Sequence, residues 1–144
     1  MERYPRVYAL SKSYGPPKIN LRDAEILDSY GDESHATRPI SHNTPRDVSR
    51  ADMDFYGWVY AFMGFRDLLF YLYPVALEYE KDLCFDSIDP FMYSLDTWIS
   101  SEMPKISVDD QDALIVGLRW IWDAGEPGYA DWEQCSSLQR VIGL

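Results

Sequence analysis

Residues 107–125, SVDDQDALIVGLRWIWDAG, contain the signals of one complete α-helix and decide the fold class. Ser107 followed three positions later by Asp110 is typical of a capping box, and acids in the first turn suit the helix dipole. Apolar side chains then recur at helical spacing, as Leu114, Ile115, Leu118, Ile121 and Trp122. Gly125 is typical of a residue that ends a helix. The segment therefore predicts an amphipathic helix that faces a core.

Further helices are predicted on the N-terminal side of this segment. Ser49 is typical of an N-cap, and the helix that follows it is expected to run to about residue 63. Residues 65–73 predict a second helical piece that Pro74 stops or kinks. Because proline also suits the first turn of a helix, a further helix is expected from Pro74 through Leu83.

The remaining elements are indicated by proline and by short apolar runs. Asp89 and Pro90 are typical of a cap and a first helical residue, and Pro104 ends the helix that they open. A last helix is expected from about Asp131. Residues 6–10 are interpreted as a short strand.

The sequence predicts an all-α fold, a single compact bundle of about five or six helices in one domain, residues 1–144. Residues 21–30 add a short helix, and residues 32–49 form a long polar loop near the N-terminal third that we expect to be mobile. The expected core consists of Phe62, Phe65, Leu68, Leu69, Leu72, Leu95, Trp98, Leu114, Leu118 and Trp122.

The negative charge is concentrated in residues 51–144. This stretch has five bases and seventeen acids, a net charge of −12, whereas residues 1–50 have eight bases and seven acids. It also contains all five tryptophans. An acidic surface repels phosphate backbones and anionic lipids, so direct binding to nucleic acid or to a membrane is disfavoured. A surface rich in acids and aromatics favours a basic protein partner. The N-terminus lacks the pattern of a secretory signal, which predicts a cytoplasmic protein.

No motif for catalysis, metal binding or cofactor binding is present. The two histidines, His35 and His42, are seven residues apart in the polar loop, a spacing that does not predict a metal site. The two cysteines, Cys84 and Cys135, are expected to be free buried thiols. There is no Gly-rich phosphate loop and no G-x-S-x-G nucleophile motif. The sequence therefore predicts no enzyme activity, no metal and no cofactor.

A candidate partner-binding surface follows from the acids and aromatics that helix capping leaves unexplained. Helix capping accounts for the first two acids of the 109–112 tract, but not for the third, and the turn after residue 125 combines acids with two aromatics. An alternative for this turn is a structural role, with its tryptophan packed in the core. The predicted partner-binding residues are Asp112, Asp123, Glu126, Tyr129, Asp131, Trp132 and Glu133.

In its small size, its acidity, its aromatic content and its lack of catalytic motifs, the chain resembles the immunity proteins of bacterial toxin–immunity pairs. The acids of 109–112 and 123–133 match the kind of surface that such inhibitors use. The resemblance implies a cytosolic protein that binds a cognate basic toxin domain and occludes its active or substrate-binding surface. It extends to general character and to no family motif.

Two other functions stay open at this point. A phage-type inhibitor that mimics nucleic acid would share the acidity, but it needs acids spaced like phosphates along an extended surface. A small enzyme could use buried carboxylates as acid and base.

The predicted core gives a test of the fold. Leu118→Ala should lower the free energy of unfolding by about 2–5 kcal/mol, because it leaves a cavity between packed helices. Chemical denaturation followed by circular dichroism measures the change. A far-ultraviolet spectrum dominated by strand would contradict the fold class, and an unchanged stability would place Leu118 outside the core.

Overall fold

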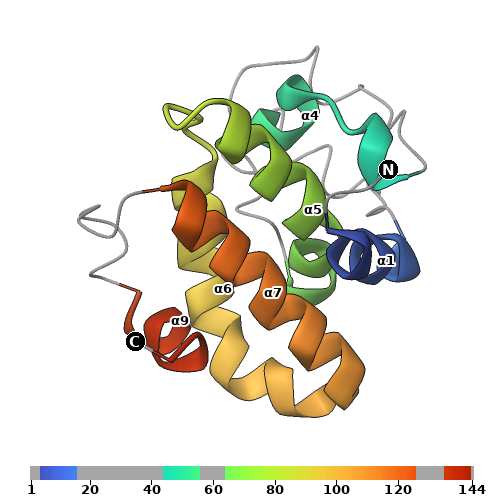
Figure 1. Ribbon diagram of the computed structural model, residues 1–144, viewed down its shortest axis with the longest axis vertical. Coiled ribbons are helices and arrows are strands. Elements are labelled where there is room, and N and C mark those ends of the chain that lie inside the picture. Colours follow the sequence, from blue (N-terminus) through green and yellow to red (C-terminus); the bar gives the residue numbers. More distant parts are fainter. Residues whose placement is uncertain (1–3, 16–43, 56–63, 126–134, 144) are drawn as a thin grey trace, which may run out of the picture.

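The computed structural model describes residues 4–15, 44–55, 64–125 and 135–143, and every regular element within these ranges is helical (Figure 1). The predicted all-α class is therefore confirmed. The elements are α1 (Pro5–Tyr14), η1 (Pro45–Asp47), α4 (Arg50–Phe55), α5 (Phe65–Lys81), α6 (Ile88–Glu102), η3 (Met103–Lys105), α7 (Val108–Ala124) and α9 (Ser136–Val141).

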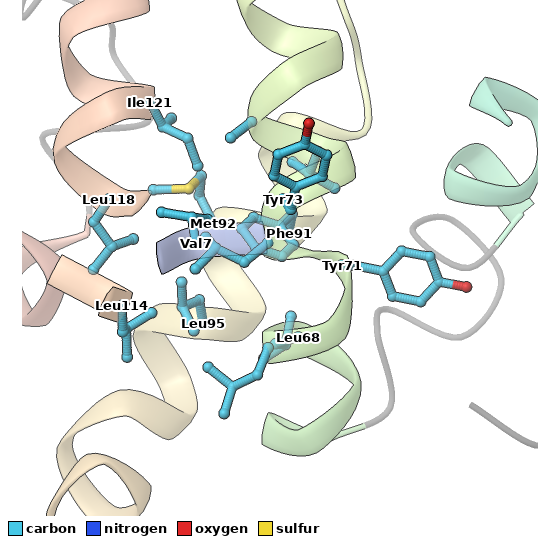
Figure 2. Close-up of a cluster of buried hydrophobic side chains, with 14 of the residues drawn as sticks. Val7, Leu68, Tyr71, Tyr73, Phe91, Met92, Leu95, Leu114, Leu118 and Ile121 are labelled. Carbon is cyan, nitrogen blue, oxygen red and sulfur yellow. The ribbon is translucent and has the colours of Figure 1, made fainter. Parts of the chain in front are cut away.

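Helix α5 lies at the centre of the bundle. It packs against α1, α6 and α7, while α9 lies beside α6 (Figure 1). Leucines 68, 69 and 72 of α5 are fully buried, and burial continues without a break as far as Ala76. Figure 2 shows side chains of α1, α5, α6 and α7 meeting in one cluster, with Tyr71 pointing away from the rest. A helix that is apolar nearly all round is expected in such a central position.

Gly117 within α7 and Gly125 at its C-terminal end allow this helix to approach α5 closely. A Cβ atom on Gly117 would lie 2.7 Å from Leu72 Cδ2, and one on Gly125 would lie 2.0 Å from the Tyr79 hydroxyl oxygen. Both distances are shorter than real Cβ contacts allow, so a side chain at either position would force Leu72 or Tyr79 to shift. Gly125 also ends α7, as the sequence predicted, and its N–H donates to the carbonyl of Ile121 at 3.0 Å.

Pro74 lies inside α5, which is one continuous helix. The predicted division into two helices at this position is therefore wrong. The buried hydroxyl of Ser11, on α1, donates to the carbonyl of Leu69 at 2.8 Å and accepts from the N–H of Tyr73 at 3.0 Å. These two backbone groups pair with each other in a regular helix. The hydroxyl thus bridges the hydrogen-bond ladder one residue before the proline, where a proline bends a helix.

The N-terminal segment forms α1, so the predicted strand at residues 6–10 is wrong. Pro5 occupies the first turn, where its missing N–H has no helical partner. The buried residues of α1 are Val7, Leu10 and Ser11. Their spacing of three and four places them on one face of a helix, whereas a strand would divide them between its two faces.

The described part of the predicted core is largely confirmed, with two corrections. Phe65, the leucines named above, Leu95, Leu114 and Leu118 are buried. Trp98, however, is 40% exposed, and Trp122 is only partly buried, while Trp120 takes the core position at 2% exposure. Residue 120 lies on the same side of α7 as Gly117, the side that faces α5. Residue 122 is about 200° around the helix from residue 120 and so lies on the opposite side. Phe62 lies outside the described residues.

Three further predictions, on the start of α4, the bounds of α6 and the two cysteines, are partly confirmed. Ser49 opens α4 by accepting from the N–H of Asp52 at 3.2 Å, as predicted. Helix α6 begins at Ile88, one residue before the expected cap, and ends at Glu102 before Pro104. Cys135 is a buried free thiol, but Cys84 is exposed, because it lies in the turn after α5.

The structure bears on only part of the long polar loop and of the last helix. Residues 44–49 of the loop contain the one-turn helix η1, which packs on α5. Residues 16–43, including the predicted helix at 21–30, lie outside the described residues, as do residues 56–63 and 126–134.

The bridge at Pro74 predicts a specific dependence between two substitutions. Ser11→Ala should cost about 1–3 kcal/mol of unfolding free energy, because it leaves a buried N–H and a buried carbonyl less well satisfied. In a Pro74→Ala background the cost should fall, since a straight helix can pair these groups directly. A double-mutant cycle by chemical denaturation measures this coupling.

Ser13→Ala is the matched control. Ser13 is exposed, and its hydroxyl donates to the carbonyl of Leu10 within the same turn of α1 at 2.7 Å, so its loss should change stability by less than about 0.5 kcal/mol. Additive effects of Ser11→Ala and Pro74→Ala would contradict the bridge.

Candidate functional site

The outer face of α7 presents the two predicted acids that the structure describes. Asp112 and Asp123 are both exposed. They are eleven residues apart, so they lie within about 20° of each other around the helix and about 16 Å apart along it. In the described part of the chain, neither carboxylate has a hydrogen bond or an ion pair. Two negative charges therefore project from one side of a well-packed helix.

At the N-terminus of α7, one acid makes a contact with another helix and its neighbour does not. The Ser107 hydroxyl accepts from the N–H of Asp110 at 3.1 Å, which confirms the predicted cap. The carboxylate of Asp110 in turn accepts from the Tyr14 hydroxyl of α1 at 3.2 Å. Asp109 is exposed. Asp110 thus ties α7 to α1, while Asp109 extends the outward face that Asp112 and Asp123 share.

One base lies on this outer face. Arg119 is exposed and lies between the two acids in the sequence, and its guanidinium donates to the carbonyl of Ile142, just after α9, at 2.9 Å. The other end of α9 is held by α6, where the Asp96 carboxylate accepts from the N–H of Leu138 at 3.0 Å. The charge of Arg119 is directed to the end of a neighbouring helix, so the face is acidic at its two ends rather than along its whole length.

Most other described acids are engaged within the fold. Arg50 forms ion pairs with Asp82 at 2.8 Å and with Glu78 at 3.6 Å, so one base engages two acids. The hydrogen bond from Arg50, together with the N–H of Cys84, holds the pKa of Asp82 below its usual range.

Further carboxylates accept from neighbouring side chains. Asp54 accepts from the Ser87 hydroxyl at 2.5 Å, Glu80 from the Trp120 indole, and Glu102 from Lys105 at 3.2 Å. Asp67 is half-buried, and burial raises its pKa. Asp86 is exposed before α6. Acids available to a partner are therefore fewer than the sequence indicated.

A cluster of aromatic rings between α1, α5 and α7 was not predicted. Tyr4 stacks on Trp120 with ring centroids 4.2 Å apart, and Tyr8 meets Tyr73 edge to face at 5.1 Å. The guanidinium of Arg46 lies 4.7 Å from the centroid of the Tyr8 ring. Burial raises the pKa of Tyr73. The signal available in the sequence was the spacing of four between the first two tyrosines, which the strand interpretation of that segment concealed.

Two further aromatics are exposed on α6. Tyr93 is 38% exposed and Trp98 is 40% exposed. An interface was predicted in the turn at 126–133 instead. Glu126, Tyr129, Asp131, Trp132 and Glu133 lie outside the described residues, so their assignment stays a prediction from sequence.

The described residues show no grouping of three or more His, Cys, Asp or Glu side chains suited to a metal ion. His35 and His42 lie outside these residues. Among the helices within 4–15, 44–55, 64–125 and 135–143, none combines the length and the apolar character that a membrane crossing requires.

Comparison of the chain with protein-family models, with curated proteins and with solved structures gave no match.

The ion pair of Arg50 predicts a pH-dependent contribution to stability. Asp82 has a folded-state pKa below its usual value of 3.8, so its carboxylate contributes stability above that pH and loses the contribution as pH falls through the lower pKa. Arg50→Gln should therefore lower the melting temperature slightly at pH 7, and the difference from the unmodified protein should shrink below pH 3.8. Differential scanning calorimetry across this range measures it.

Lys81→Gln provides the control, because it removes one exposed positive charge from the end of α5 without removing a described ion pair. Its effect should not follow the titration of Asp82. If both variants have the same pH dependence, the contribution of Arg50 is one of net charge alone.

Proposed function

We propose that this protein is an immunity-type inhibitor that binds a basic protein toxin through the outer face of α7 and blocks it without catalysis. The observation that carries the proposal is the pair Asp112 and Asp123, exposed on one side of a packed helix and without described partners. Carboxylates that stabilise the fold are expected to be paired, so these two are the acids best placed for a partner.

The setting of α7 favours binding. Its N-terminus is capped by Ser107, and its inner face is fixed against α5 at Gly117 and Gly125. A surface held in one conformation loses little conformational entropy on binding, which leaves more of the interaction energy as affinity. The proposed interface therefore requires little rearrangement of the described helices.

The charge of the whole chain supports capture of a basic partner. The net charge of −11 attracts a positively charged protein over long distances and raises the association rate. A toxin that acts on an anionic substrate holds that substrate with Lys and Arg side chains. Acids of α7 placed against these side chains would occlude the substrate-binding surface. The proposed location of this encounter is the cytoplasm.

The arrangement of α7 favours a protein partner over mimicry of nucleic acid. Phosphates recur at a regular interval, whereas Asp109, Asp112 and Asp123 are separated by three and then eleven residues. Arg119 is also exposed on the same face. Unevenly spaced acids with a base between them do not match the regular charges of a phosphate backbone.

Charge reversal on α7 tests the proposal. Co-purification from the native host, followed by mass spectrometry, identifies the partner, and co-expression shows whether the protein relieves its toxicity. Asp112→Lys and Asp123→Lys should then each slow association, and together by about ten-fold at low salt, with a smaller dependence on ionic strength. Stopped-flow kinetics measures both effects.

Asp47→Lys is the matched control, since it changes net charge equally at an exposed position on η1. It should slow association much less than either α7 variant. Equal slowing by all three variants would mean that net charge alone guides association, and a partner whose activity is unaffected by the complex would refute inhibition.

A further inference from the structure

Trp98 is an exposed tryptophan on α6, a helix whose inner side packs in the core. The core-facing arc of α6 contains Phe91, Leu95 and Ile99, all fully buried. Trp98 lies at one flank of this arc, about 60° around the helix from Leu95. No ring contact or cation of the described residues involves its indole. A large apolar ring in this position is available to a partner.

The surroundings of Trp98 are suited to an apolar or stacked contact. The hydroxyl of Thr97 donates to the carbonyl of Tyr93 at 2.9 Å, and that of Ser101 donates to the carbonyl of Trp98 at 3.2 Å. These short side chains satisfy their own donors within α6. A partner would therefore not need to supply acceptors to them, and long side chains do not cover the indole from these positions.

The charge around Trp98 is mainly negative. Residues 82–104 contain five acids and no Lys, Arg or His, and two of these acids are paired with bases outside the range, Asp82 with Arg50 and Glu102 with Lys105. Asp86 is exposed just before α6. A positive group that approached this helix would be attracted, and no base of the helix would compete for the indole. A second copy of the chain would bring the same acids against each other and would be repelled.

Other aromatic rings of this protein make a contact that the indole of Trp98 lacks. Arg46, Arg50 and Arg66 each place a guanidinium over an aromatic ring of the fold, at 4.7, 5.1 and 5.7 Å from the centroids of Tyr8, Phe85 and Tyr14. Arginine is the cation most often found over aromatic rings, and tryptophan is the ring that binds it best. Trp98 is accordingly an aromatic platform without an arginine of its own among the described residues.

We propose that the outer face of α6 is a second docking surface, on which an arginine of a basic protein partner stacks on Trp98 within the negative field of residues 82–104. This inference deepens the proposed function, because it rests on the partner being basic, but it concerns a different helix. Trp98 is expected to slow dissociation, whereas the acids of α7 accelerate association.

The test uses two synthetic peptides of equal length and charge, one with four arginines alternating with glycine and one with four lysines in the same places. Titration into the ¹⁵N-labelled full chain is followed by NMR. The arginine peptide should shift the indole N–H signal of Trp98 and bind more tightly than the lysine peptide. Trp98→Leu should weaken arginine-peptide binding about two- to five-fold and remove most of the preference for arginine.

Leu83→Ala is the matched control, because Leu83 is a large apolar side chain of similar exposure, 46%, in the turn before α6. It should leave the binding of both peptides unchanged. An unshifted Trp98 indole, equal binding of the two peptides, or equal binding by the unmodified protein and Trp98→Leu would overturn the proposal. The indole shift is measured on the unmodified chain, so it decides the matter even if a variant folds poorly.

Two further measurements separate this inference from others. If Asp112→Lys with Asp123→Lys weakens binding of both peptides while Trp98→Leu does not, the α7 surface stands and the α6 surface fails; the reverse result supports α6 and contradicts α7. Sedimentation velocity gives the remaining outcome. A dimer that Trp98→Leu converts to monomer would show that a second copy occupies the surface, and the proposed partner chemistry would be wrong.

Discussion

The arrangement of this bundle depends on how α5 accommodates Pro74. A proline removes one donor from a helix and displaces the carbonyl four residues earlier, which would leave backbone groups of a central helix poorly satisfied. Ser11, on α1, bonds to the adjacent pair of backbone groups, the carbonyl of Leu69 and the N–H of Tyr73. The glycine contacts of α7 reach α5 at Leu72 and Tyr79, one on each side of the proline. Both α1 and α7 therefore dock on the part of α5 around Pro74.

Local chemistry explains what could be predicted of the fold. Ser107, Gly125 and Pro104 act within a few residues of their own positions, and the helix ends that they predict are found. Pro74 was misinterpreted because its compensation comes from Ser11, more than sixty residues away in the chain. No local pattern shows that a buried hydroxyl will be available at such a distance.

The same distinction applies to the candidate surfaces. The exposure of Asp112 and Asp123 followed from helical spacing and from the capping role of their neighbours, both of which are local. The ion pairs of Arg50 with Glu78 and Asp82 join residues about thirty positions apart, so the sequence could not show that these acids are already engaged. Trp98 was assigned to the core because it lies next to the apolar arc of α6, and only the packing of neighbouring helices decides whether a residue at that flank is covered.

Helix α9 has only six residues, too few to be stable as an isolated helix in water. One of its ends is fixed by Asp96 of α6 and the other by Arg119 of α7. Its folded state therefore depends on its contacts with two longer helices, α6 and α7, each of which carries one of the proposed surfaces. A partner that changed the spacing of α6 and α7 would therefore loosen α9 before it disturbed the core.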